Sequence, residues 1–182
     1  VTSLTFGISL LLSVQVADSG LISYALGGWA APVGIEYRID ALTVLVLMIV
    51  SGIGAVVMWY SHESLAVEIP YDQYSRFHVM YLLSLSGLLG IVITGDLFNV
   101  FVFLEISALS SYVLVSLGRD RRALTAAYQY LIMGTIGATF ILIGIGLMYM
   151  MTGTLNMADM AVRLRGVAET RTVLAAFGFL TI

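Results

Sequence analysis

Long apolar runs separated by short polar breaks make up most of the chain. Each complete run covers roughly 17–25 residues, the length an α-helix needs to cross the hydrocarbon core of a bilayer. Lipid offers no hydrogen-bond partner to exposed backbone groups, so such runs are expected to be helices. The pattern predicts a single all-α domain, a polytopic transmembrane helical bundle with about five spans and the start of a sixth: residues 1–16, 40–60, 77–94, 97–117, 123–151 and an incomplete 172–182.

The polar breaks predict the connections between these helices. Residues 17–39 and 61–76 are the longer ones, Gly95 and Asp96 form a tight turn, and 118–122 is short and basic. After the fifth run, apolar residues at near-helical spacing alternate with charged ones, which predicts a short interfacial helix at about 155–165. Since the chain opens on Val1 inside an apolar run and closes within another, we expect a piece of a longer membrane subunit.

Composition supports the membrane class and excludes others. The chain is 60% hydrophobic and 10% charged, with a mean hydropathy of +1.01, whereas soluble domains carry about 25% charged residues. It has no Cys, which excludes disulfides and thiolate metal sites, and no basic run, so no nucleic-acid partner is expected. No phosphate-binding loop, metal cluster or catalytic triad stands out. The sequence therefore favours a transporter subunit over an enzyme, without a cofactor or bound metal.

The distribution of arginine predicts the orientation. The 118–122 break has three Arg against one Asp, which places it in the cytoplasm, and alternation then puts 17–39 and Gly95–Asp96 outside and 61–76 inside. Three Arg in the outside segment 152–172 count against this assignment.

One acid stands inside an otherwise apolar run. Glu105 lies eight residues after Leu97, about 12 Å along a helix and near the middle of a bilayer core. An ionisable group there costs roughly 2.5–3.5 kcal/mol on insertion scales, so it must face protein or water. A proton relay would explain it; the alternative is a protonated glutamate that only hydrogen-bonds to a neighbouring helix. Lys is absent and no Arg falls in a predicted span, so a cationic partner would lie outside residues 1–182.

Other polar residues near the ends of the runs are weaker candidates for a proton path. Asp40 and Asp96 each open a predicted span, where an acid commonly caps the helix but could also take up ions. His62 and His78 flank the 61–76 break, where a histidine can pass protons near neutral pH or serve as an interfacial polar residue. Tyr112 shares the Glu105 face by helical spacing.

Small residues recur at a spacing of four, which predicts close helix contacts because backbones can then approach each other in lipid. The sets are Ser86, Gly90 and Thr94; Ser107 and Ser111; and Gly134 and Ala138.

Three stretches resemble one family. The strings TGDLFNVFVFLEISALSSYVLV (94–115), IEYRIDALTVLVLMIV (35–50) and 128–161 are similar to the D-type subunit of Mrp multisubunit Na⁺/H⁺ antiporters. That subunit belongs to a superfamily of antiporter-like subunits shared with respiratory complex I and membrane-bound hydrogenases. The resemblance is collinear over nearly the whole chain, and it implies the second to early seventh helix of a fourteen-helix subunit.

The resemblance implies a function as well. It implies that Glu105 pairs with a lysine in a broken seventh helix, just beyond Ile182, in a proton half-channel that is coupled to Na⁺ export. The expected partners are other membrane subunits, the bilayer, H⁺ and Na⁺, in the inner (plasma) membrane of the cell. Two rivals stay open: a proton-pumping subunit of complex I or of a hydrogenase, without a redox site of its own, and a structural scaffold in which Glu105 never ionises.

Overall fold

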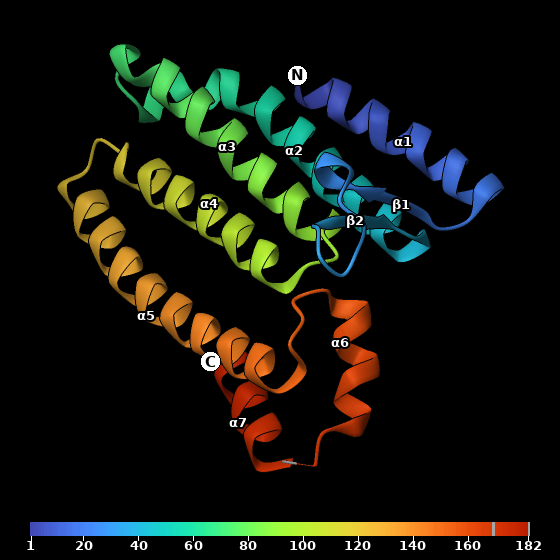
Figure 1. Cartoon of the computed structure of the whole chain (residues 1–182). Coiled ribbons are helices and arrows are strands. Elements are labelled where there is room, and N and C mark those ends of the chain that lie inside the picture. The colour runs from blue at the N-terminus through green and yellow to red at the C-terminus, as the bar shows by residue number, and fades with distance from the viewer. Residues whose placement is uncertain (169, 182) are drawn as a thin grey trace.

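The computed structural model describes residues 1–168 and 170–181, and in them the chain forms seven α-helices and one β-hairpin (Figure 1). This confirms the all-α, polytopic helical class. The elements in order are α1 (Thr2–Ser19), β1 (Ile22–Ala25), β2 (Glu36–Ile39), α2 (Ala41–Glu68), α3 (Tyr74–Ile93), α4 (Leu97–Ser116), α5 (Arg121–Thr152), α6 (Met157–Arg163) and α7 (Thr170–Thr181). Single 3₁₀ turns lie at Leu26–Gly28, Tyr71–Gln73 and Leu164–Gly166.

Four of the described helices are long and apolar enough to cross a membrane: α2, α3 together with the turn before it, α4 and α5. The first run, expected as a span, is the 18-residue helix α1, but Gln15 and Asp18 near its end lower its hydropathy and it is not among the four. The last run forms α7, which ends at Thr181; Ile182 lies outside the described residues.

One predicted break is wrong over half its length. Residues 61–76 were expected to connect two spans, but α2 continues through His62 and Glu63 to Glu68. The reason is packing: Leu65 is buried, and Leu65 and Ile69 form a core cluster with Leu117. His62, Glu63 and Glu68 therefore lie on the exposed side of a continuing helix, whereas Ser61 is buried with Leu65.

The helices pack mainly against their neighbours in the sequence. The most extensive contact joins α3 to α4, and α4 also packs on α5, which in turn carries α7 (Figure 1). At the contact with α7, Ala176 is fully buried, and the Phe140 and Phe179 rings stack at 5.8 Å. In this arrangement α4 lies between α3 and α5.

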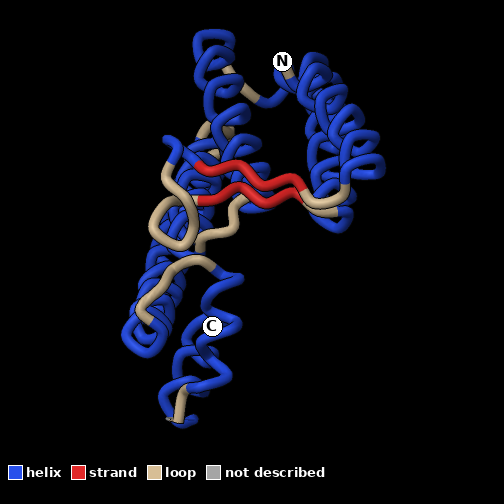
Figure 2. Tube along the Cα trace, turned by 45° about the vertical axis from the view of Figure 1, so that its right-hand side comes forward, coloured by secondary structure: helices blue, strands red, loops and turns tan. Residues whose placement is uncertain are grey.

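The bundle has two distinct ends. The hairpin end holds β1 and β2, the α3–α4 elbow (94–96) and the α5–α6 loop (153–156); the arginine end holds the α2–α3 connection and residues 117–122. Figure 2 shows the two strands lying crosswise to the helices at the hairpin end. At the arginine end, the Arg119 guanidinium donates to the Ile69 carbonyl at 3.2 Å. Alternating connections thus lie at opposite ends, as expected for helices that run antiparallel.

The sequence pattern did not predict the hairpin. β1 and β2 pair antiparallel with Tyr24 opposite Tyr37, and each strand has only four residues. A two-stranded hairpin is marginal by itself. Here β2 gains a further neighbour, because Tyr37 also forms an antiparallel bridge to Thr94 in the α3–α4 elbow. The hairpin in the long break is therefore also held by a segment more than fifty residues away.

Candidate functional site

Glu105 lies near the middle of α4 and is partly buried. It precedes Tyr112 by seven residues, two helical turns, so both lie on the same side of the helix. Tyr112 packs edge-on against Tyr130 of α5, with ring centroids 4.7 Å apart. Glu105 therefore faces the α5 side of the bundle. Within residues 1–168 and 170–181, its carboxylate makes no hydrogen bond or ion pair.

The opposite side of α4 is fixed against α3. The Ser84 and Ser111 hydroxyls lie 3.3 Å apart and share a hydrogen bond between the two helices. Gly87 allows the close approach, since a Cβ there would lie 2.8 Å from the Phe103 carbonyl oxygen and from the Ser107 Cβ. The predicted small-residue contacts at Ser107 and Ser111 thus join α4 to α3, which sets the rotation of α4 and so the direction of Glu105.

Backbone hydrogen bonds hold the start of α4 from two sides. The Gly95 N–H donates to the Glu36 carbonyl at 2.7 Å, and the Gly95 carbonyl accepts from the Met157 N–H at 2.9 Å. The Leu97 N–H donates to the Leu155 carbonyl at 2.8 Å. The α3–α4 elbow therefore lies between β2 and the α5–α6 loop and bonds to both through its backbone.

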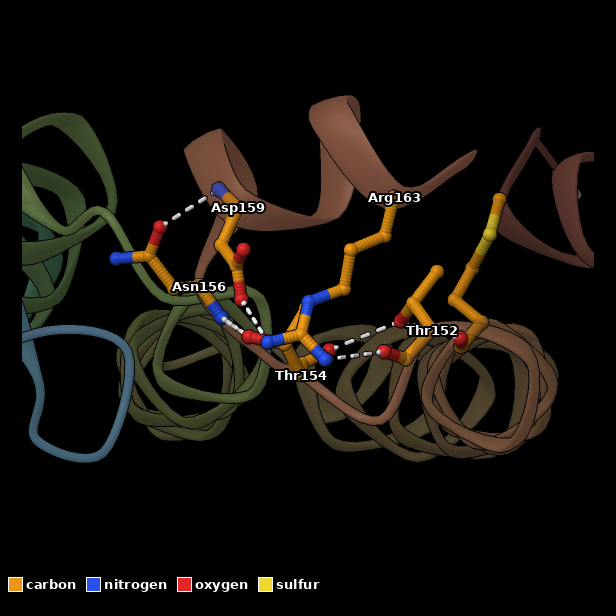
Figure 3. Close-up of polar contacts among 6 residues, drawn as sticks. Thr152, Thr154, Asn156, Asp159 and Arg163 are labelled. Carbon is orange, nitrogen blue, oxygen red and sulfur yellow. Dashed lines mark hydrogen bonds and ion pairs between the residues drawn. The ribbon is translucent and has the colours of Figure 1, made fainter. Parts of the chain in front are cut away.

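Side-chain hydrogen bonds between Glu36, Ser23 and the buried Asn156 complete the hairpin end. The Asn156 amide donates to one Glu36 carboxylate oxygen at 3.2 Å, and the Ser23 hydroxyl donates to the other at 2.6 Å. The Asn156 side-chain oxygen Oδ1 accepts from the Asp159 N–H at 3.0 Å, which caps α6 (Figure 3). Because Asn156 is only 4% exposed, its polar atoms need these partners.

Arg163 ties α6 back to the end of α5. Its guanidinium donates to the Thr152 carbonyl at 3.1 Å and forms an ion pair with Asp159 at 2.9 Å (Figure 3). The hydrogen bond from Arg163 lowers the pKa of the Asp159 carboxyl, with a further contribution from Thr154. This group of contacts was not predicted, although an Asn three residues before an acid is a local signal for a helix start.

The two acids expected at span starts are helix caps. The Asp96 carboxylate accepts from the Asn99 N–H at 2.8 Å, and the Asp40 carboxylate accepts from the Thr43 N–H at 2.9 Å. Hydrogen bonds from Thr43 lower the pKa of the Asp40 carboxyl, with smaller contributions from Leu42 and Arg38. Asp96 is buried; Asp40 is exposed and, with Glu36 and Arg38, lines an open pocket of about 400 Å³.

The histidines lie in another part of the bundle. His62 and His78, with Ser3 and Glu63, line an open groove of about 960 Å³ whose walls come from α1, α2 and α3. The His78 Nδ1–H donates to the Tyr74 carbonyl at 2.7 Å. Glu105 faces α5, so the structure does not bring the histidines together with it. No group of three acidic or histidine residues in the described part of the chain could hold a metal ion.

Comparisons with known proteins agree with this architecture. Residues 94–182 match the family described as NADH:quinone oxidoreductase/Mrp antiporter, TM. The chain is 44% identical over 157 residues to the N-type subunit of the NADH-quinone oxidoreductase of Desulforudis audaxviator, covering 86% of this chain and 31% of that protein. It is 32% identical over 163 residues to the D-type subunit of the Na⁺/H⁺ antiporter of Alkalihalophilus pseudofirmus, covering 90% and 32%.

A solved structure shows the same fold. A chain of the membrane-bound sulfane sulfur reductase, an archaeal respiratory membrane complex, superposes with a TM-score of 0.87 at 33% identity, covering 98% of this chain and 36% of that chain. The chain thus spans about a third of the length of the relatives it matches.

Fold, apolar helices and relatives define the class: a multi-pass membrane protein related to subunits of multisubunit membrane complexes. Within that class, the chain belongs to the antiporter-like membrane subunits of the NADH:quinone oxidoreductase and Mrp antiporter family.

Proposed function

We propose that this chain is part of a proton-translocating subunit of a cation/H⁺ antiporter complex, and that Glu105 is a proton relay in its half-channel. The observation that carries the proposal is a single acid near the middle of α4, partly buried and turned toward α5. Burial in an apolar helix bundle is costly for a charge, and a group whose charge is costly can be loaded and unloaded with protons. A relative whose name describes a Na⁺/H⁺ antiporter supports exchange with Na⁺.

The geometry suggests the way in which the relay is held. α3 fixes α4 on one side, the elbow fixes its start, and Glu105 is left on the side that faces α5. The proposed direction of uptake is from the arginine end, with residues 118–122 in the cytoplasm of an inner-membrane protein. The chain contains no lysine that could pair with Glu105, and it spans about a third of the length of its relatives, so the proposed relay is placed in the larger subunit and its complex.

Replacement of Glu105 in the intact complex tests the proposal. Glu105→Gln keeps the shape and removes the titration, and Glu105→Ala removes both; each is expected to abolish Na⁺-driven proton movement in proteoliposomes. Glu68→Gln is the matched control, because Glu68 is exposed at the end of α2. Wild-type exchange by Glu105→Gln, with the complex intact, would contradict the relay.

A second candidate is a proton-pumping subunit of a redox-driven complex, supported by the 44% identity to an NADH-quinone oxidoreductase subunit. The discriminating measurement is proton movement by the purified complex without an electron donor. Movement driven by a Na⁺ gradient alone supports the antiporter, and movement that requires quinone reduction supports the pump.

The third possibility is a scaffold in which Glu105 stays protonated. Infrared titration of the Glu105 carboxyl, with Glu105→Gln as the difference reference, separates this case. A carboxyl band that persists at every accessible pH supports the scaffold; a band that disappears as the pH rises supports the relay.

A further inference from the structure

Tyr112 is a buried polar residue of α4 and lies on the same side of the helix as Glu105. It is 8% exposed, whereas its ring partner Tyr130 on α5 is 51% exposed. The two rings meet edge to face at an interplanar angle of 72°. Tyr112 therefore stands in the contact between α4 and α5 rather than at the lipid-facing surface.

Gly134 of α5 makes room for the Tyr112 hydroxyl. A Cβ built at Gly134 would overlap that hydroxyl and would lie 2.7 Å from Cζ of the ring. By contrast, a Cβ at Gly137, one turn further along α5, would meet nothing within 4 Å. Because residue 134 has no side chain, the Tyr112 hydroxyl can lie directly against α5 at that position.

The Tyr112 hydroxyl has no partner within the protein. In the described residues no protein atom hydrogen-bonds to it, and although the residue as a whole is buried, this oxygen is not among the fully buried atoms without a partner. Water can therefore reach the hydroxyl and supply its hydrogen bond. The ionisable groups that act on it electrostatically are Glu105 and Tyr130. Helical side chains lean toward the N-terminus of their helix, so the Tyr112 ring points along α4 toward the Glu105 turn.

Two turns separate the two residues, about 10 Å along the axis. The phenol shortens that gap, and water can bridge polar groups that are too far apart for a direct hydrogen bond. We propose that Tyr112 is a positioning residue for Glu105: its hydroxyl, seated over Gly134, orients the water that reaches the carboxyl from the arginine end. This rests on the proposed relay role of Glu105. Tyr112 itself gains and loses no proton in this scheme.

Three variants of the intact complex test the inference by Na⁺/H⁺ exchange in proteoliposomes. Tyr112→Phe keeps the ring and removes the hydroxyl, and is expected to lower the rate about fivefold, the loss of one hydrogen bond. Gly134→Ala displaces the hydroxyl and is expected to lower the rate as well. The double variant should be no slower than Tyr112→Phe, because both changes remove the same contact.

A packing role gives the opposite pattern. If Tyr112 only fills space, Tyr112→Phe exchanges at the wild-type rate, and the double variant also exchanges at the wild-type rate because the overlap with the hydroxyl is relieved; either result overturns the inference. Tyr128→Phe is the matched control, because Tyr128 is exposed, on the helix that carries Gly134. A wild-type rate for Tyr112→Phe beside an inactive Glu105→Gln overturns this inference alone, whereas an active Glu105→Gln overturns the proposed function.

A spectroscopic readout separates positioning from stability. Tyr112→Phe should shift the infrared band of the Glu105 carboxyl, since the band reports the hydrogen bonding of that group, and Tyr128→Phe should leave it in place. An unshifted band in Tyr112→Phe would overturn the proposal even if the exchange rate fell.

Discussion

The Asn156 amide donates to the Glu36 carboxylate at 3.2 Å across 120 residues of chain. This contact joins the hairpin to the α5–α6 loop, and the α3–α4 elbow lies between them through Gly95. Since α4 starts directly after the elbow, the contact belongs to the structure that fixes the depth of Glu105 in the bundle. The hairpin end is thus a part of the support of the candidate site.

Asn156→Asp is expected to destabilise the protein. The substitution keeps an acceptor for the Asp159 N–H but sets a carboxylate against Glu36, so a partly buried hydrogen bond becomes a like-charge contact. Losing a hydrogen bond so that a polar group is left without a partner lowers the free energy of unfolding by about 1–3 kcal/mol. The measurement is the thermal unfolding midpoint of the complex in detergent.

A charge swap serves as the control. Glu36→Gln combined with Asn156→Asp places an amide donor against a carboxylate again, so the midpoint should recover most of the loss. A double variant as unstable as Asn156→Asp alone would show that the Glu36 contact is not the cause.

Gly87→Ala is expected to lower stability although alanine is the better helix former. Its Cβ would lie 2.8 Å from the Phe103 carbonyl oxygen, which forces α3 and α4 apart. Overpacking of this kind costs about 1–3 kcal/mol, more than the roughly 1 kcal/mol that helix propensity returns. Gly137→Ala meets nothing within 4 Å, so it should leave the unfolding midpoint unchanged or raise it. Equal midpoints for the two variants would contradict the close approach of α3 and α4.

Local patterns in the sequence were enough to predict α4, capping as one of two roles for Asp96, and a close helix contact at Ser107 and Ser111, although not that α3 is the partner. Each depends on hydropathy or on spacing within one helix, which the sequence records directly. The continuation of α2 was missed because His62 and Glu63 suggested a break, while the burial of Leu65 depends on Leu117, far along the chain.

The contacts at the hairpin end could not be predicted for a similar reason. The strands are four residues long, and their stability depends on the elbow at Thr94. Likewise, Glu36 stands in a polar, Gly-rich break and acquires its role only when Asn156 is brought to it. Pairings between distant segments leave no periodicity in the sequence that could indicate them.

A pair of substitutions at Asp40 distinguishes a capping role from a role in ion uptake. Asp40→Asn keeps an oxygen that accepts from the Thr43 N–H but loses the charge, whereas Asp40→Ala loses both. If Asp40 is only a cap, Asp40→Asn exchanges ions at the wild-type rate and Asp40→Ala lowers the unfolding midpoint. Equal loss of exchange in both variants, measured in proteoliposomes at matched protein content, would instead indicate that the charge itself takes part in ion uptake.

Asp159 should make stability depend on pH in the acid range. Its ion pair with Arg163 holds the pKa of the carboxyl below its ordinary value of 3.8. A group whose pKa is lower in the folded state stabilises that state fully above the ordinary pKa, and the contribution is lost as the pH falls through the lowered value. Wild type should therefore exceed Asp159→Asn in unfolding midpoint at neutral pH, and the gap should close on acidification. Asp72→Asn, at an exposed acid of the arginine end, should show no such gap. A gap for Asp159→Asn that stays constant down to the acid limit would mean that the ion pair with Arg163 is not its source.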